Sequence, residues 1–581
     1  MAIYNERGCV SRRAFISGAL SVGALSALAL SGCGGSKQVA SGSASDANAK
    51  LDSKQELNLD YTDLQTLDVN DIRNSNEFLV LSQVQEGLFR TFTKDGKDDV
   101  QNAGCESYDV SDDKLTYTFH LRKNSWSDGQ PVVAQDYVDS LLRLVNPDNG
   151  FSYSYMAADI VGAQDYMDGK GSADAVAVKA VDDYTLEYKI VAPIPFFTAK
   201  LANVCFFPVR KDLVDKYGKD MANDYTKQVY NGPFVISDRV LDNSLTLKPN
   251  DKYWDAKNVK LTKVTYTVVA EEATKSQLLS SKQLDAVKAT TEYTTKWQKE
   301  ADAGKLVGVE RPDVLVDYLS FNMHTGGPSG LMNNEKVRLA LSLAIDRDDF
   351  NKAIFSGLYK PAYGLVPDGI KSGDKVFRDV TDEPLKAVEK KYKDKKAVVA
   401  LFKEGLKEVT GSDDPKAVTF TILGQVTSTQ NKNQLEWFQQ EFENVFGVKV
   451  NINSQSESAS FVSERNANNY DFYVMGWMGD FSDPVTFMDC WFTTSGYAKF
   501  MGGYSNADFD KDYDSLQTMS DEDERLQTYQ RMEKNLVADH AGMAPLVYGV
   551  KYIFNQTYVK DLSLPQFGTD FEVSRTFISG K

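Results

Sequence analysis

Histidine and cysteine are scarce in this chain of 581 residues, which has three histidines and five cysteines. His120, His324 and His540 belong to no H-E-x-x-H motif, and the sequence contains no C-x-x-C, G-x-S-x-G or G-x-x-x-x-G-K-[ST] pattern. Carboxylate pairs such as Asp112-Asp113 and Asp182-Asp183 are suited to acid and base roles, but with 82 acidic residues such pairs are expected on solvated surfaces. The sequence therefore predicts no enzyme, no metal site and no cofactor.

The chain also lacks an excess of positive charge. Its 65 basic and 82 acidic residues give a formal net charge of −17, which argues against a nucleic-acid partner because phosphate binding requires a positive surface. The contents of 42% hydrophobic and 25% charged residues are typical of globular proteins, and the length predicts two or three domains. Beyond the first 35 residues, no uncharged apolar run approaches the length of a membrane span.

The N-terminal 32 residues have the order of an export signal. Ser11-Arg12-Arg13-Ala14-Phe15-Ile16 resembles the twin-arginine signal, and an uncharged apolar segment follows it. Leu30-Ser31-Gly32-Cys33 resembles the lipobox of bacterial lipoproteins, in which the cysteine becomes the lipidated first residue. An ordinary N-terminal helix or a membrane span is the alternative, but the many Gly, Ser and Ala residues make a poor span. We expect a signal peptide over residues 1–32 and a lipid on Cys33 that holds the exported protein at the outer face of the cytoplasmic membrane.

A tether and three internal cysteines follow the signal. Residues 33–50 are rich in Gly, Ser and Ala and predict a flexible linker, so the folded body is expected to start near Leu51. Cys105, Cys205 and Cys490 are an odd number for pairing within one chain. One disulfide with a free thiol and three buried thiols are both compatible with their spacing.

The body alternates strand and helix patterns. Leu115 to Leu121 alternates polar and apolar residues as a strand does, and Ala134 to Val145 has apolar residues at helical spacing before Pro147. Leu435 to Phe446 predicts another helix that ends at Gly447, and Val448, Val450 and Ile452 predict a strand after it. This alternation indicates α/β lobes.

One stretch near the C-terminal end, GWMGDFSDP at Gly476 to Pro484, combines a tryptophan with two acids. Tyr470 to Met475 before it is aromatic and uncharged apart from Asp471, which favours a buried strand, and Ser482-Asp483-Pro484 favours a turn. Trp477 and Asp480 are therefore expected where a strand emerges. Ligand groups often occupy such positions, but the pattern alone does not identify a ligand.

Several stretches in a fixed order resemble the extracellular solute-binding proteins of peptide ABC transporters, the oligopeptide-binding group. The GWMGDFSDP stretch lies at the expected late position, and the resemblance runs from about residue 55 to the end. The other stretches that carry it are Val84 to Phe89 (VQEGLF), Leu115 to Pro131 (LTYTFHLRKNSWSDGQP), Tyr230 to Phe234 (YNGPF), Asn250 to Asn258 (NDKYWDAKN) and Val337 to Arg347 (VRLALSLAIDR).

The resemblance implies an α/β fold of the periplasmic-binding-protein type, a two-lobe clamp with an extra inserted domain, mixed sheets and two hinge crossings. The implied first lobe combines residues 51–91, 223–314 and 548–581. The inserted domain is expected at 92–222 and the second lobe at 315–547. Hinge closure in such a clamp buries the ligand between the lobes.

The resemblance also implies a function and a set of site residues. It implies a monomeric, lipid-anchored oligopeptide receptor that delivers its ligand to a pair of permease subunits with cytoplasmic ATPases. In peptide binders of this family the acid at the position of Asp480 pairs with the ligand's free α-amino group. Trp477, Tyr318 and Tyr155 match aromatic positions that line the family's cleft. An extended peptide is expected to bond its main chain to the cleft as an added strand, with its side chains in roomy pockets.

The sequence departs from the family pattern where the ligand's C-terminus is held. One family arginine that meets the carboxylate of short ligands falls at Val474, whereas another matches Arg465. An acidic cleft residue of the first lobe falls at Arg73, and Thr427 to Lys432 lacks the family's histidine. Arg465 and Arg73 are therefore candidate anion contacts, and the ligand length stays open.

Local alternatives exist for each residue and for the function. Asp480 also fits a turn acid, Trp477 fits plain core packing, and arginines are usually solvated. The same clamp can hold an oligosaccharide, a nickel complex or haem, and a surface receptor for peptide pheromones has the same fold. An exported hydrolase is a remote alternative, because no nucleophile and base converge in the sequence.

Overall fold

A computed structural model describes residues 50–581 except Ser75, Asp95, Gly496 and Gln517. The predicted signal peptide, the lipidation of Cys33 and residues 33–49 of the tether lie outside the described residues. Within the described part of the chain, no helix combines the length and the apolar character that crossing a bilayer requires.

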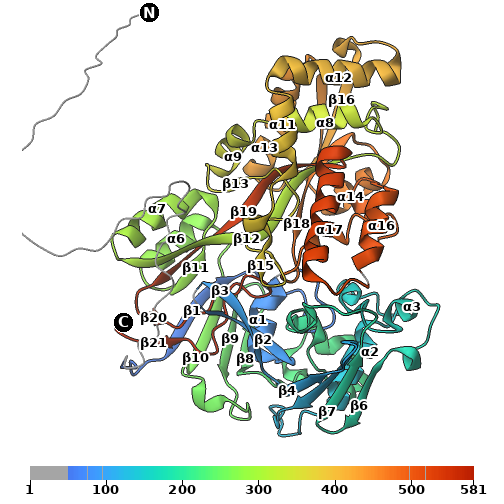
Figure 1. Ribbon diagram of the computed structural model, residues 1–581. Helices are drawn as coiled ribbons and strands as arrows, with labels where there is room; N and C mark the ends of the chain where they lie inside the picture. The colour runs from blue at the N-terminus through green and yellow to red at the C-terminus, as the bar shows by residue number, and fades with distance from the viewer. Residues whose placement is uncertain (1–49, 75, 95, 496, 517) are drawn as a thin grey trace, which may run out of the picture. The chain divides into compact units, whose positions relative to one another are not determined.

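An eleven-stranded mixed sheet forms the centre of the fold (Figure 1). Its order is β17-β16-β18-β12-β19-β11-β1-β10-β9-β8, and the short β13 pairs with β19. The strands are β1 (Glu56–Tyr61), β8 (Phe234–Val240), β9 (Ser244–Pro249), β10 (Lys263–Val268), β11 (Ala286–Lys288), β12 (Leu306–Phe321), β13 (Lys360–Pro361), β16 (Thr419–Gln425), β17 (Lys449–Gln455), β18 (Phe472–Met478) and β19 (Met543–Gln556).

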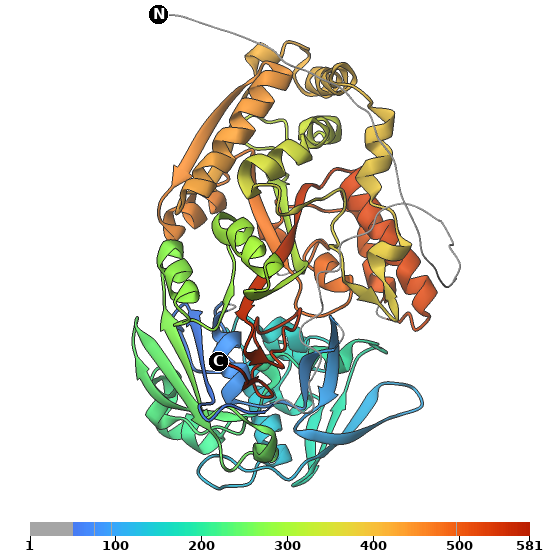
Figure 2. The same cartoon turned by 90° about the vertical axis from the view of Figure 1, so that its left-hand side faces the viewer.

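The two long strands β12 and β19 connect the two sections of this sheet. They pair antiparallel along most of their length, with register shifts between Pro312 and Val316 and between Asp317 and Tyr318. Figure 2 shows the red strand β19 running from the lower into the upper part of the described body. The predicted crossings near residues 315 and 548 fall inside these strands, and the domain boundaries stay a prediction.

A separate four-stranded antiparallel sheet lies between β1 and β8 in the sequence. Its order is β4-β5-β7-β6, with β4 (Cys105–Val110), β5 (Thr116–Leu121), β6 (Val178–Asp182) and β7 (Thr185–Lys189). Helix α2 (Ala134–Leu144) contacts β6 and β7 and buries Tyr137, Val138 and Leu141. The predicted strand and helix in this region are thus confirmed to within one residue at each end.

The remaining strands form short antiparallel pairs, and helices cover the sheets. The strand pairs are β2 (Phe89–Lys94) with β3 (Lys97–Asn102), β14 (Lys371–Ser372) with β15 (Lys375–Val376), and β20 (Val559–Lys560) with β21 (Phe577–Ile578). The helices other than α2 are α1 (Asn76–Val84), α3 (Ala163–Met167), α4 (Phe197–Lys200), α5 (Lys211–Tyr217), α6 (Glu272–Ser280), α7 (Thr291–Asp302), α8 (Glu335–Ala344), α9 (Arg347–Phe355), α10 (Phe377–Val380), α11 (Pro384–Lys391), α12 (Lys395–Thr410), α13 (Thr429–Phe446), α14 (Ser458–Asn466), α15 (Val485–Met488), α16 (Ala507–Leu516) and α17 (Glu522–Lys534).

Helix α13 shows how local chemistry sets the element ends. The Ser428 side chain accepts a hydrogen bond from the backbone N–H of Asn431, which caps the N-terminus six residues before the predicted start. Gly447 ends the helix in the left-handed conformation, with φ of 73°. The buried face of the helix packs on β16 and β17, so the predicted helix and the strand after it are confirmed.

The three cysteines in the described residues are buried free thiols. Cys105, Cys205 and Cys490 form no disulfide there, so the second of the two alternatives from the sequence holds. Burial raises the pKa of the Cys105 thiol to about 12, which keeps it protonated at neutral pH. These residues therefore contribute apolar packing.

Candidate functional site

Strand β18 ends at Met478, and the chain then turns at Gly479 and Asp480. The N–H of Gly479 donates to the carbonyl of Val314 at 2.8 Å, and the N–H of Asp480 donates to Oγ1 of Thr486 at 3.1 Å. A Cβ at position 479 would lie 2.8 Å from the ring of Phe487, so the close approach of the turn to α15 requires glycine. The turn fixes the Asp480 carboxylate just beyond the strand end.

The carboxylate of Asp480 is half-buried and only partly satisfied. Its Oδ2 accepts a hydrogen bond of 2.6 Å from the hydroxyl of Tyr155, which lies 325 residues away in the sequence. Its Oδ1 accepts no hydrogen bond, and no cation lies within ion-pair distance, among the described residues. Burial raises the pKa of Asp480 to about 6, although the bond from Tyr155 and the charge of Lys200 oppose the rise. The group is an acid that lacks a positive partner.

Three aromatic rings support this acid. The Tyr155 ring lies edge-on to Tyr497 with centroids 5.4 Å apart, and Tyr497 lies edge-on to Trp477 at 5.1 Å. The indole Nε1 of Trp477 donates to the carbonyl of Thr486 at 2.6 Å. Asp480, Tyr155 and Trp477, three of the predicted site residues, are thus brought together. Tyr497 and Thr486 join them without any signal in the sequence.

Further charged groups surround Asp480. Lys200 forms an ion pair with Asp159, so its charge is largely compensated. Oδ1 of Asp489 is buried without a hydrogen-bond partner among the described residues, and burial together with the charge of Asp480 raises the pKa of Asp489. The surroundings are therefore net acidic and favour a cation.

A cavity of about 310 Å³ lies beside the Asp480 turn. Its lining includes Phe196 and Ser482, and the Phe196 ring stacks on Phe481 with centroids 4.7 Å apart. Further lining residues come from the β2–β3 hairpin, the β14–β15 hairpin, the long strand β12 and the segment after β20. Segments that are far apart in the sequence thus enclose this space.

The outer edge of β18 is free next to the site. β18 pairs with β12 along all seven of its residues, from Phe472 to Met478. On its other side it pairs with β16 only at Phe472 and Tyr473. Within the described residues, Val474 to Met478 therefore have no strand partner on that side. Unpaired N–H and C=O groups of such an edge can pair with an added strand.

Arg465 lies on α14 near the start of this free edge. Its guanidinium carbon is 4.4 Å from the centroid of the Phe500 ring, and its Nε is buried without a hydrogen-bond partner. No ion pair to Arg465 exists among the described residues. Its role as an anion contact stays a prediction.

The other two predicted residues have different surroundings. Tyr318 is fully buried on β12, and its hydroxyl donates to Sδ of Met501 at 3.0 Å. Arg73 is exposed and pairs with Asp71 at 2.5 Å. No contact joins either residue to Asp480 in the described structure. Their ligand roles stay predictions, and these surroundings give them no support.

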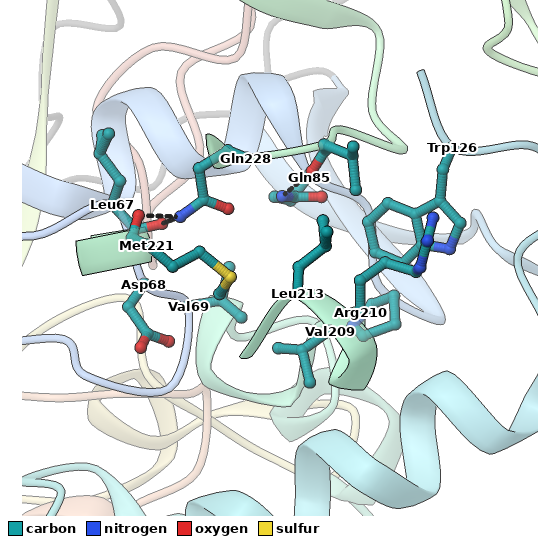
Figure 3. A pocket seen from close by; sticks show the side chains of 12 residues that line it. Leu67, Asp68, Val69, Gln85, Trp126, Val209, Arg210, Leu213, Met221 and Gln228 are labelled. Atoms are coloured by element: carbon teal, nitrogen blue, oxygen red, sulfur yellow. Dashed lines mark hydrogen bonds between the residues drawn. The ribbon is translucent and has the colours of Figure 1, made fainter. Parts of the chain in front are cut away.

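A small pocket whose lining does not include Asp480 is shown in Figure 3. Its residues include Leu67, Gln85, Trp126 and Met221, and its volume is about 20 Å³. The side-chain N–H groups of Gln228 donate to the carbonyls of Leu67 and Met221 (Figure 3). The space holds about one water molecule, so it is no site for a solute.

Comparisons with known proteins identify the family of this chain. The family model of bacterial extracellular solute-binding proteins, family 5 (middle part), matches residues 99–499. The oligopeptide-binding protein OppA of Bacillus subtilis (strain 168) is 29% identical over 549 residues, which cover 92% of this chain and 94% of that protein.

Solved structures are similar over nearly the whole described chain. Listeria monocytogenes OppA bound to peptide has a TM-score of 0.75 and 28% identity, and the match covers 91% of this chain and 100% of that one. The Escherichia coli murein tripeptide binding protein MppA has a TM-score of 0.76 and 27% identity, with the same coverage. The predicted two-lobe fold of the periplasmic-binding-protein type is confirmed. Proteins of this family bind solutes and are not enzymes, and this chain belongs to the bacterial extracellular solute-binding proteins, family 5.

Proposed function

We propose that this protein is the lipid-anchored substrate-binding component of an oligopeptide ABC importer. It encloses an extended peptide, holds the peptide's free α-amino group on Asp480, and presents the ligand to a permease pair with cytoplasmic ATPases. The observation that carries this proposal is the half-buried Asp480 carboxylate, which has one hydrogen-bond donor and no cation. The names of the relatives, which bind oligopeptides or a murein tripeptide, support the same ligand class.

An ammonium group suits the Asp480 site. It offers three N–H donors, whereas an ionised carboxylate only accepts. A charge-assisted hydrogen bond contributes about 1.5 to 3 kcal/mol, which is well short of the roughly −8 kcal/mol of micromolar binding. The rest of the binding energy must come from contacts that tolerate many sequences. Main-chain hydrogen bonds along Val474 to Met478 meet this requirement, because every peptide carries the same main chain.

The other predicted residues have different roles in this proposal, and some contact the ligand while others do not. Tyr155 and Trp477 orient the amine end, and Arg465 receives a carboxylate of the ligand. Arg73 is left as a surface contact and Tyr318 as a supporting core residue. Cys33 carries the lipid, and its replacement by alanine should abolish incorporation of labelled fatty acid into the protein.

The first test identifies the natural ligand. Protein without residues 1–33 is purified and analysed by native mass spectrometry, and any bound material is released by denaturation and sequenced. Short peptides with free amines are the expected result. An empty protein that also shows no thermal shift with a defined peptide library would point to a non-peptide solute.

The second test concerns Asp480. Asp480→Ala should weaken binding of free-amine peptides by about 10- to 100-fold, the effect of one charge-assisted hydrogen bond. The same peptides with an acetylated N-terminus should bind wild type and variant equally. Asp148→Ala, the same substitution at an exposed turn, is the matched control. Equal losses for both peptide forms would remove Asp480 from the amine-binding role.

A further inference from the structure

A cavity of about 330 Å³ opens where β16 and β18 separate. We call it the amide pocket. Figure 1 shows β16, β18 and helices α13 and α14 in the same part of the molecule. The pocket is lined by Leu423, Gly424, Gln425, Thr427, Asn431, Gln434, Leu435, Phe461 and Val474. None of these residues is charged.

The polar groups of the amide pocket have unused hydrogen-bonding capacity. The side-chain amides of Gln425 and Gln434 are half-buried and form no hydrogen bond with any described residue. The carbonyl of Asn431 accepts from the hydroxyls of Thr427 and Ser428, which leaves its Nδ2 without an acceptor. Half-buried amides that lack partners both donate and accept, so they suit a ligand group that also does both.

The walls of the pocket disfavour a charged guest. Leu423, Leu435, Phe461 and Val474 are apolar, and no lining residue offers a counter-charge. A charge placed there would lose hydration without compensation, whereas a neutral amide or hydroxyl would exchange water for protein hydrogen bonds. The nearby cation, Arg465, contacts Phe500 at 4.4 Å and does not line the pocket.

The position of Val474 connects the pocket to the amine end. Val474 lines the pocket and begins the free edge of β18, which ends at Met478. Four residues of strand span about 13 Å. A peptide added to this edge with its amine on Asp480 therefore places its fourth or fifth residue opposite the pocket.

We propose that the amide pocket is a specificity subsite for a neutral, hydrogen-bonding side chain at the fourth or fifth residue of the bound peptide. Gln, Asn, Ser and Thr belong to this class. The inference rests on the proposed function, because it requires a peptide fixed at Asp480. It adds a preference for one kind of side chain to a site that otherwise binds the peptide through its main chain.

The test uses pentapeptides with free amines in which positions four and five are both Gln, both Leu or both Glu. Calorimetry on the wild-type protein should give about 3- to 10-fold tighter binding for Gln than for Leu or Glu, the effect of one neutral hydrogen bond. Gln434→Leu and Asn431→Leu should each reduce this preference. Gln440→Leu makes the same change on the exposed side of α13 and should leave the preference for Gln pentapeptides unchanged.

The outcomes separate this inference from the proposed function. If Gln, Leu and Glu pentapeptides bind equally and the pocket variants change nothing, the subsite is overturned while peptide binding stands. If no free-amine peptide binds, the function itself fails. A tripeptide that ends before the pocket should bind all variants equally, which also shows that each variant is folded. If the Glu pentapeptide binds most tightly, Arg465 attracts the ligand side chain at the pocket, and the proposal of a subsite for neutral side chains is overturned.

Discussion

The two ends of the free β18 edge differ in charge and in hydrogen bonding. At one end, Asp480 is fixed by a turn and by the rings of Tyr155, Tyr497 and Trp477. At the other end, the amide pocket is uncharged and lined by side chains with free amides. A receptor that accepts many peptides needs one contact that every ligand can make, and the α-amino group supplies it. Differences in affinity among ligands then arise at the other end, the amide pocket, where contacts are weak and neutral.

The largest expected effect that distinguishes the ends is pH dependence. Asp480 has a pKa of about 6 without ligand and must be ionised to hold an ammonium. Affinity for free-amine peptides should therefore fall about tenfold between pH 7 and pH 5, as the ionised fraction drops from about nine-tenths to one-tenth. Calorimetry at both values, with the acetylated peptide as control, measures this. If the affinity for free-amine peptides is the same at both pH values, Asp480 either stays ionised at pH 5 or does not bind the amine.

The second effect concerns the stability of the ligand-free protein. Folding raises the pKa of Asp480 from 3.8 to about 6, so the folded state binds a proton more tightly than the unfolded state does. The stabilisation of the folded state by this proton is lost as pH rises through 4 to 6. Asp480→Asn should therefore stabilise the empty protein at pH 7 by about 1 to 2 kcal/mol, and much less at pH 4. Thermal unfolding at the two pH values tests this. A variant less stable than wild type at pH 7 would mean that the acid is structurally required.

Sequence patterns predicted elements whose apolar residues repeat regularly, such as α2 and the second half of α13. The first six residues of α13, Thr429 to Gln434, carry no apolar residue, so only the Ser428 cap marks that start. The buried strand that the sequence predicts over Tyr470 to Met475 is β18. Its pairing with β12 carries the strand on to Met478.

The candidate site was less predictable, because its contacts join distant segments. The pairing of Tyr155 with Asp480 spans 325 residues, and no local pattern reports it. For Tyr318 a local pattern exists, but it does not reveal the surroundings of the side chain. Its alternation with Ser320 and Asn322 indicates one face of a strand but not whether that face meets a cleft, and here Tyr318 is fully buried. The free amides of Gln425 and Gln434 likewise depend on the separation of β16 and β18, which no local pattern reports.

A smaller effect should follow if the neutral end is given a charge. Val474→Arg places a guanidinium at the edge of the amide pocket, where it can meet a ligand carboxylate. Peptides with a free C-terminal acid should then bind about fivefold better than their carboxamides. Val474→Gln, which is long but neutral, should show no such gain. If the glutamine variant gains equally, side-chain length and not charge explains the change.

The smallest expected effect comes from Tyr155→Phe, which removes one donor from Asp480 but keeps the ring. Because the Tyr155 hydroxyl lowers the pKa of Asp480, its loss should move the midpoint of the pH profile upward. At pH 8 the carboxylate is ionised in both proteins, so affinity should change by no more than about threefold. Tyr153→Phe makes the same change two residues away, where the hydroxyl donates no bond to Asp480. Identical pH profiles for Tyr155→Phe and wild type would mean that the Tyr155 hydroxyl does not lower the pKa of Asp480 in the ligand-free protein.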